Sequence, residues 1–302
     1  MRKARFKPTG KPAFYHLYNR VAGEPDFYPF GRAEKEKFIS LLHKLQKYYT
    51  VKVLSYQVMS NHFHLEVFAP PKAPRAKEVV RRYRAYYGRH DLKVSDPRCA
   101  RLGERMRDIS CFMHALQQQF AMWYNRTRST PRRGPLWAGR FKNTLLGGAE
   151  ALWGCWKYIE MNSYRAGLVS DPAQYRFGSY GAWTGRGRHP FEANVCEVLL
   201  PVLRDRYRFS SMRDIYIGLK HAFAEVCGRN MEAGEAKDRF STRLDRRVRY
   251  WVDGLVIGSE QFLREAVQIS KGLLRPNRKM PVKAVSSDPS SALCAFRELP
   301  NG

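Results

Sequence analysis

The sequence predicts an α+β domain followed by a C-terminal helical extension. Residues 13–21, 51–59 and 62–68 are rich in aromatic and β-branched side chains and alternate in polarity, which predicts three strands. Between the first two strands, residues 32–49 carry apolar side chains at helical spacing, which predicts an amphipathic helix. With 302 residues, of which 44% are hydrophobic and 13% aromatic, the chain is long enough to bury a substantial core.

The later part of the chain is predicted to be mainly helical. We expect helices over residues 71–90, 104–125 and 149–167, a polar linker at 92–103 and a last strand near 175–183. We divide the chain into a domain at 1–187, an accessory helical region at 188–274 and a tail at 275–302, whose composition predicts mobility. Residues 245–269 fit either a DNA-reading helix-turn-helix or a plain pair of packed helices, and we favour packing.

The charge of the chain predicts a polyanionic partner. The formal net charge is +27, which favours nucleic acid over an anionic membrane surface. No apolar run is long enough to cross a bilayer, and the basic N-terminus leads into no apolar signal segment. The six cysteines lack zinc-ligand spacing, as is typical of a reducing cytosol, and no Gly-rich nucleotide-binding loop is found. We therefore expect a cytoplasmic nucleic-acid-binding protein without a nucleotide cofactor.

Two histidines one residue apart are the first candidate site. In the strand-like run YQVMSNHFHLEVF at 56–68, His62, His64 and Glu66 alternate with apolar residues and so share one face. Two imidazoles side by side on an open sheet face make half of a divalent-metal site. Alternatively, they are two partly exposed polar residues on a half-buried strand. His16 lies on the first predicted strand. We expect it to be a core residue or to support a metal ligand, in preference to being a ligand itself.

The predicted helix at 149–167 supplies the groups that would complete such a site. Its core stripe contains Leu152, Trp156 and Ile159, while Tyr158 and Asn162 lie one turn apart on another face. A phenol is a poor nucleophile while protonated, because its reference pKa is about 10. A divalent ion held by the two histidines and the Asn162 carboxamide oxygen would neutralise a phosphate and align it for attack by Tyr158.

Cationic segments surround these motifs. The helix at 71–90 carries Arg81 and Arg82 among three tyrosines, a mixture that suits single-stranded DNA, although a solvated helix face explains it equally well. The loop at 127–134 contributes Arg132 and Arg133. The following GRFK segment is either a cationic strand or a phosphate-binding element.

Four segments of the chain resemble a known family. The chain resembles the single-tyrosine HUH transposases, and most closely the REP-associated tyrosine transposases. Its matching segments are FYHLYNRV at 14–21, MSNHFHLEVF at 59–68, GPLWAGRFKN at 134–143 and KYIEMNSYRAGLV at 157–169, in the family's order. Ser60 replaces the family's usual proline, and Ser163 and Tyr164 replace its usual Pro-Val, but neither change removes a functional group.

The resemblance implies both a fold and an activity. The fold would be a ferredoxin-like antiparallel sheet with helices on one face, and the tyrosine helix would pack beside the histidine strand. The activity would be cleavage and rejoining of single-stranded DNA near hairpins, with Mg²⁺ or Mn²⁺, by a monomer or homodimer associated with a bacterial nucleoid. Tyr158 would be the nucleophile and His62, His64 and Asn162 the metal ligands. The predicted DNA contacts are Asn19, Arg20, Arg81, Arg82, Arg132, Arg133, Arg140, Lys142 and Arg165.

The sequence is therefore compatible with three functions. The first is a tyrosine transposase, which forms a covalent 5′-phosphotyrosine intermediate. The second is a metal nuclease that uses water, with Tyr158 only packing. The third is a noncatalytic DNA- or RNA-binding regulator, which would need none of His62, His64, Tyr158 and Asn162.

Overall fold

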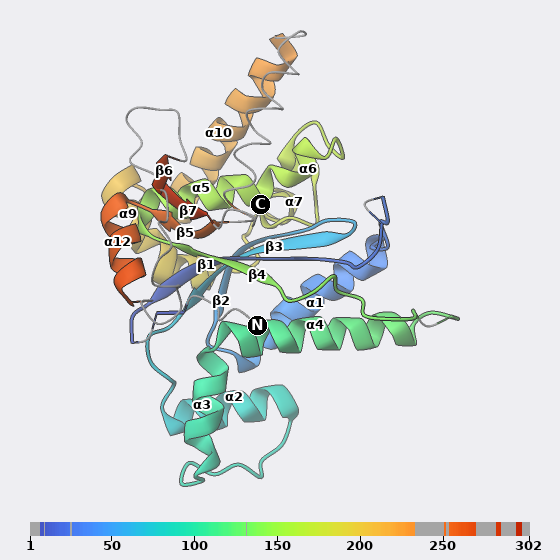
Figure 1. The fold of residues 1–302 in the computed structure, drawn as a ribbon, viewed down its shortest axis with the longest axis vertical. Coiled ribbons are helices and arrows are strands. Elements are labelled where there is room, and N and C mark those ends of the chain that lie inside the picture. Colours follow the sequence, from blue (N-terminus) through green and yellow to red (C-terminus); the bar gives the residue numbers. More distant parts are fainter. Residues whose placement is uncertain are drawn as a thin grey trace.

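The computed structural model describes residues 7–8, 10–24, 26–130, 132–232, 251, 254–269, 282–284 and 294–297. Its centre is a seven-stranded sheet in the order β2-β3-β1-β4-β5-β7-β6 (Figure 1). The strands are β1 (Ala13–Arg20), β2 (Lys52–Val58), β3 (His62–Ala69), β4 (Lys142–Leu146), β5 (Gly254–Gly258), β6 (Val282–Ala284) and β7 (Cys294–Arg297). All neighbouring pairs among them are antiparallel except β4 and β5, which are parallel.

The first four strands form a ferredoxin-like core. Their order in the sheet is β2-β3-β1-β4, and α1 (Arg32–Tyr48) connects β1 to β2. The second connection, from β3 to β4, contains α2 (Ala76–Tyr87), α3 (Arg98–Arg107) and α4 (Ile109–Arg126). The predicted α+β class and ferredoxin-like arrangement are confirmed.

Helices cover both faces of this sheet. The face that carries Tyr15, Leu17 and Phe63 packs against α1 and α4, which form one apolar core. A second core lies on the opposite face, under α5 (Gly148–Glu160), as Figure 1 shows. The two connecting helices thus lie on one face, as expected, and the helix that carries Tyr158 covers the other.

The remaining helices follow α5 along the chain. They are α6 (Asn162–Arg165), the short helix η1 (Pro172–Gln174), α7 (Ser179–Arg186), α8 (Glu192–Asn194), η2 (Val195–Leu199), α9 (Leu200–Tyr207), α10 (Met212–Glu232) and α12 (Glu260–Ile269). Among the described residues, no helix combines the length and the apolar character that crossing a bilayer requires. The C-terminal extension is helical from α8 to α10, as the sequence predicts.

Two local predictions within the N-terminal domain are wrong. The helix expected over 104–125 is two helices, because Asp108 leaves helical geometry and its carboxylate accepts from the backbone N–H groups of Ser110 and Cys111. An aspartate in this position caps a new helix. Half of the expected linker at 92–103, from residue 98 onward, belongs to α3. The strand expected near 175–183 is instead a turn that leads into α7, whose N-cap is Gly178.

The C-terminal part also differs from expectation. The residues expected to form the turn of a helix-turn-helix form β5, which pairs with β4 and so lies inside the sheet. That pairing excludes the helix-turn-helix, whereas the basic helix expected before it lies mostly outside the described residues. Within the expected mobile tail, β6 and β7 pair with each other and β7 pairs with β5. The described part of the tail therefore extends the sheet.

Candidate functional site

The two histidines of β3 lie on the face of the sheet that α5 covers. Register across β1 and β3 places His62 opposite Arg20, His64 opposite Tyr18, and Glu66 opposite His16. Directly opposed residues share a face, so these six side chains form one polar stripe. The stripe exists because both strands alternate apolar and polar residues in phase.

The imidazoles are close enough to share an ion. The ring centres of His62 and His64 lie 5.2 Å apart, with their planes nearly perpendicular. A metal sits about 2.1 Å from a ligating nitrogen, hence roughly 3.2 Å from the ring centre, so two rings can share one metal up to a separation of about 6.4 Å. Nδ1 of His62 donates to the side-chain oxygen of Asn61 at 2.7 Å. Nε2 is then the nitrogen of His62 with a free lone pair.

Tyr158 faces the histidine pair from α5. Its ring centre lies 5.5 Å from that of His64 and 5.6 Å from that of His16, edge to face in both cases. The indole of Trp251 stacks on the Tyr158 ring, with the ring centres 5.6 Å apart. Only 7% of Tyr158 is exposed. The sequence-predicted nucleophile is therefore beside the predicted metal ligands, but it is covered rather than open to solvent.

The position of Tyr158 is fixed by contacts at the end of α5. Gln57 of β2 donates to the backbone oxygen of Glu160 at 3.0 Å and accepts from the backbone N–H of Ser163 at 3.2 Å. The helix expected over 149–167 breaks between them, at Met161, and resumes as α6. This clamp ties the tyrosine helix to the sheet, two strands away from β1.

Asn162 and Arg165 both contact Tyr158. The Asn162 amide group donates to the backbone oxygens of Tyr158 and Ile159 at 3.0 and 3.1 Å, while its side-chain oxygen accepts from Arg165 at 2.9 Å. The Arg165 guanidinium also donates to the Tyr158 backbone oxygen at 2.8 Å and lies 4.4 Å from the centre of its ring. Arg165 thus holds both the Tyr158 backbone oxygen and the Asn162 carboxamide oxygen.

Two glycines, Gly147 and Gly148, lie at the start of α5, and contacts from the C-terminal region hold this part of the helix. Gly148 has a φ of +84°, which favours glycine. Gly147, however, donates to the backbone oxygen of Ile257 in β5 at 2.8 Å, and a side chain there would collide with Phe262 of α12. The C-terminal strands therefore hold the first turn of the tyrosine helix in place.

Burial controls the ionisation of these groups. Burial, followed by the positive charges of Arg165 and Arg20, lowers the pKa of His62 to about 4. Burial likewise lowers the pKa of His64 well below its usual value, with further contributions from His16, His62 and Arg165. Both rings are therefore neutral at pH 7, as metal ligation requires. Burial raises the pKa of Tyr158, and Arg165 opposes that rise.

The residues present fit a divalent metal in part. Among the described residues, no group of three or more His, Cys, Asp and Glu side chains could hold an ion. A site here would therefore consist of the two imidazoles, an amide oxygen and oxygens of the nucleic acid. The Asn162 oxygen accepts one hydrogen bond from Arg165, and its second lone pair would coordinate the ion. Mg²⁺ and Mn²⁺ accept oxygen-rich, incompletely protein-bound shells of this kind.

Two carboxyl groups are buried in this part of the protein, Glu66 in the stripe and Glu160 of α5. Glu160 accepts hydrogen bonds from the Ser179 hydroxyl and, at 3.1 Å, from the Tyr180 backbone N–H, so it caps the N-terminus of α7. Burial raises its pKa to about 8. Glu66 is fully buried, and burial raises its pKa well above the usual value. Neither carboxyl group reaches the histidine pair by a described hydrogen bond.

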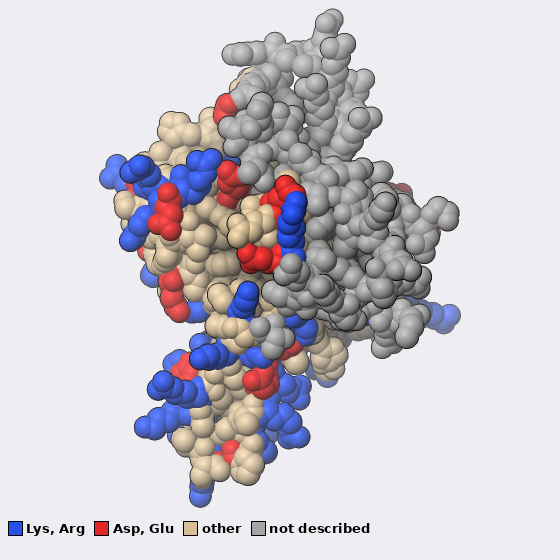
Figure 2. Space-filling model, turned by 60° about the vertical axis from the view of Figure 1, so that its left-hand side comes forward, with Lys and Arg blue, Asp and Glu red and all other residues tan. Residues whose placement is uncertain are grey.

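The predicted DNA contacts on α2 have structural partners. Arg81 and Arg82 both bind Glu78, at 2.7 and 2.6 Å. Arg82 also donates to the backbone oxygens of Gln46 and Tyr49 at 3.0 and 2.9 Å, which satisfies the C-terminal carbonyls of α1. Arg82 is thus mainly a helix cap, whereas Arg81 remains exposed. Figure 2 shows cations gathered on the lobe made by α2 and α3, and the exposed ones include Lys77, Arg81, Arg84, Arg89, Lys93, Arg98, Arg101 and Arg105.

The remaining predicted DNA contacts are likewise of two kinds, those with structural partners and those with exposed side chains. Asn19 is buried, and its amide donates to the Gly139 backbone oxygen at 3.0 Å, so it is not available on the surface. Arg132 is half-buried and donates to the backbone oxygens of Ala22 and Pro135. Exposed side chains remain at Arg20, Arg133, Arg140 and Lys142, of which Arg20 is opposite His62 in the sheet.

Three residues of the site were not identified from the sequence. Tyr18 lies with its ring centre 4.8 Å from that of His64, and Asn61 binds His62. Both follow from the strand register once β1 and β3 are paired. Trp251 carries no local signal, because it reaches Tyr158 from a distant part of the chain.

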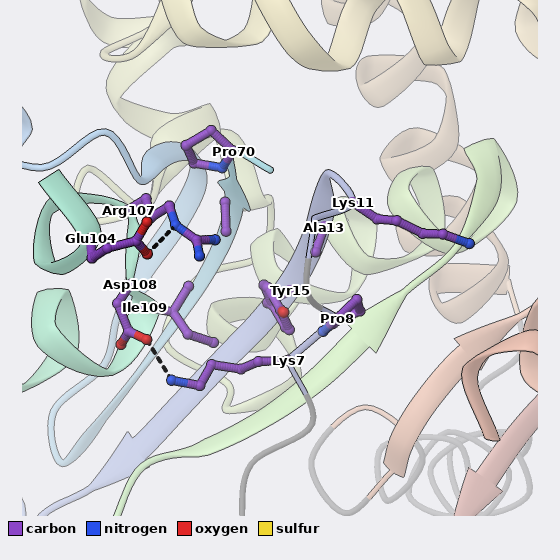
Figure 3. A pocket seen from close by; sticks show the side chains of 11 residues that line it. Lys7, Pro8, Lys11, Ala13, Tyr15, Pro70, Glu104, Arg107, Asp108 and Ile109 are labelled. Carbon is purple, nitrogen blue, oxygen red and sulfur yellow. Dashed lines mark hydrogen bonds and ion pairs between the residues drawn. The ribbon is translucent and has the colours of Figure 1, made fainter. Parts of the chain in front are cut away.

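A separate pocket is unrelated to this site. It measures about 210 Å³ and lies on the other face of the sheet, beside Tyr15 (Figure 3). Its charged side chains are paired with each other, Lys7 with Asp108 at 2.5 Å and Arg107 with Glu104 at 2.8 Å, as the dashed lines in Figure 3 mark. We assign it no function.

Comparison with known proteins gives a distant structural similarity. No protein-family model matches the chain, and no curated protein matches it. A solved structure of a REP-associated tyrosine transposase bound to a REP hairpin is similar to the chain. The match has 13% sequence identity and a TM-score of 0.42, and it covers 63% of this chain and 90% of the other. At that distance we base no functional conclusion on it.

Proposed function

We propose that this protein is a metal-dependent DNA transposase or endonuclease that cuts and rejoins single-stranded DNA through Tyr158. The observation that carries the proposal is the meeting of three groups on one sheet face. These are a neutral histidine pair, a phenol 5.5 Å from His64 between ring centres, and a guanidinium 4.4 Å from that phenol. A protein that only binds nucleic acid needs no such combination.

The proposed reaction exchanges one phosphodiester for another. The Tyr158 oxygen bonds to phosphorus, the bond from phosphorus to the 3′ oxygen breaks, and the phenol proton is released while the 3′ oxygen gains one. The products are a 5′-phosphotyrosine and a free 3′ hydroxyl, which can later attack the phosphotyrosine or another end. Because no phosphoanhydride is consumed, no nucleotide is required.

The chain's own residues contribute orientation and charge. His62 and His64, with the Asn162 oxygen, would hold Mg²⁺ or Mn²⁺, which when bound supplies positive charge against the scissile phosphate. Arg165 favours ionisation of the phenol through its own charge. Since Trp251 stacks on Tyr158 and little of that ring is exposed, the substrate phosphate must displace one of the covering groups.

The DNA would approach along the cationic surfaces. Arg20, Arg133, Arg140 and Lys142 are exposed, and Arg20 borders the histidine pair. The formal net charge of +27 suits a phosphate backbone, and binding of this type weakens steeply as salt rises. Single-stranded or hairpin DNA is the proposed substrate, and the protein would act in the cytoplasm, on nucleoid DNA, as a monomer or homodimer.

The test is covalent trapping on end-labelled DNA. The protein is incubated with a single-stranded hairpin library and Mg²⁺ or Mn²⁺, then denatured and resolved by size. The 3′-labelled fragment should stay attached to the protein, and the 5′-labelled fragment should end in a free 3′ hydroxyl. Tyr158→Phe should abolish the adduct but bind hairpins normally, and Tyr164→Phe is the matched control. Retained adduct in Tyr158→Phe would overturn the assignment of the nucleophile.

The same assay separates the two other functions. Cleavage that leaves a free 5′ phosphate and no attached protein would indicate a metal nuclease that uses water. Binding without cleavage by any divalent ion would indicate a nucleic-acid-binding regulator on this fold.

A further inference from the structure

A chain of buried hydrogen bonds runs from the C-terminal region to the histidine pair. Nδ1 of His16 lies 2.8 Å from the backbone oxygen of Trp251, and Nε2 of His16 lies 2.9 Å from Nδ1 of His64. The Trp251 oxygen also accepts from the hydroxyl of Thr144 in β4, at 3.0 Å. His16 is 1% exposed and His64 2%, so water does not complete their bonding.

The direction of each hydrogen bond follows from its fixed end. A backbone oxygen can only accept, so Nδ1 of His16 carries a proton. His16 is 1% exposed, and no described hydrogen bond or ion pair gives it a carboxylate partner, so a charge on its ring would be buried without compensation and the ring is neutral. Its Nε2 is therefore an acceptor, and Nδ1 of His64 must be the donor to it. In a neutral imidazole this leaves the lone pair on Nε2 of His64.

We propose that His16 is a positioning residue that selects the metal-binding tautomer of His64, with the Trp251 backbone oxygen as its anchor. His62 reaches the same state by another route, because Asn61 accepts from its Nδ1. Both histidines of β3 would then present Nε2 as a ligand. Ligating histidines usually have such a partner, and loss of the partner lowers metal affinity by about 10- to 100-fold.

The arrangement gives the C-terminal region a defined part in the site. The anchor oxygen belongs to Trp251, whereas His16, His64 and Thr144 belong to three strands of the ferredoxin-like core. Among the described residues, the hydrogen-bond partner of His16 Nδ1 is the Trp251 backbone oxygen and not a side chain of the core. The inference rests on the proposed function only in treating His64 as a metal ligand. The tautomer itself is a property of the metal-free protein.

The first measurement is the tautomer of His64 in the full-length, metal-free protein. Long-range nitrogen–proton NMR correlations of ¹⁵N-histidine-labelled protein distinguish Nδ1–H from Nε2–H rings. Assignment uses His64→Gln and His16→Gln spectra. We expect His64 as the Nδ1–H form in wild type. An Nε2–H ring at His64 would overturn the inference, whatever the protein does to DNA.

The second measurement is Mn²⁺ affinity, followed by electron paramagnetic resonance of the free ion. His16→Leu removes the acceptor and should weaken binding by about 10- to 100-fold. His16→Gln places a carboxamide near the former Nε2, so it should recover most of the affinity. Thr144→Val loosens the anchor but leaves the acceptor, and should cost only a few-fold.

The outcomes separate this inference from the proposed function. Equal Mn²⁺ affinity of wild type and a folded His16→Leu would reject a positioning role for His16. Equal loss in the Leu and Gln variants would reject it too, because it would indicate a packing role. If the Nδ1–H tautomer and the graded affinities are found but DNA is never cut, the inference stands and the proposed function fails.

Discussion

Arg165→Gln should slow formation of the covalent adduct by 10- to 100-fold. The Arg165 guanidinium carbon lies 4.4 Å from the centre of the Tyr158 ring. Two unit charges at that distance interact by about 4 kcal/mol at an effective dielectric constant of about 20. Because Arg165 is only half-buried, we take about 1.4 to 2.7 kcal/mol as its effect on the phenolate, which equals one to two pKa units for Tyr158.

The assay is single-turnover adduct formation at saturating hairpin DNA, so that weaker binding does not enter the rate. Burial raises the pKa of Tyr158, so the wild-type rate should rise about tenfold per pH unit from pH 7 to 9. Arg165→Gln should run parallel and reach the wild-type rate one to two pH units higher. Arg165→Lys keeps the charge and should retain most of the rate, and Arg176→Gln is the surface control. An unchanged rate in Arg165→Gln would refute the electrostatic role.

Three further predictions concern stability, measured by urea unfolding. His189 has its pKa lowered to about 3 by burial, below its unfolded value of 6.5, so the unfolded chain binds more protons as the pH falls. Between pH 6.5 and 5, the free energy of unfolding should fall by about 2 kcal/mol more in wild type than in His189→Asn. Parallel plots of unfolding free energy against pH for the two proteins would contradict this. Arg82→Gln should lower the free energy of unfolding by about 1 to 3 kcal/mol, because the backbone oxygens at the C-terminal end of α1 lose their partner. Arg81→Gln should lower it by less than about 0.5 kcal/mol. Asp108→Ala should cost about 1 to 2 kcal/mol through the lost cap of α4, and no loss would argue against that capping role.

The sequence predicted the site where local periodicity decides geometry. Alternation in β3 places His62 and His64 on one face, and helical spacing places Tyr158 one turn before Asn162. The same rules failed at Asp108, where one capping side chain divides a continuous apolar pattern into α3 and α4. That break has a local signal, since aspartate is a preferred N-cap residue.

Long-range contacts account for the features that the sequence did not predict. Trp251 covers Tyr158 and anchors His16, yet nothing near it in the chain marks it as part of a site. Arg82 was grouped with DNA-binding cations because its neighbours are basic, but the carbonyl groups of α1 take up its guanidinium. Each depends on which elements meet in space, and composition does not encode that.

The most direct measurement is the mass of the peptide that carries the nucleotide after covalent trapping and protease digestion. The proposed reaction predicts a 5′-phosphorylated nucleotide on the peptide that contains Tyr158, formed only with a divalent ion. Tyr18, whose ring also lies against His64, should stay unmodified. A nucleotide on Tyr18, or cleaved DNA with no modified peptide, would contradict the assignment of Tyr158 as the nucleophile.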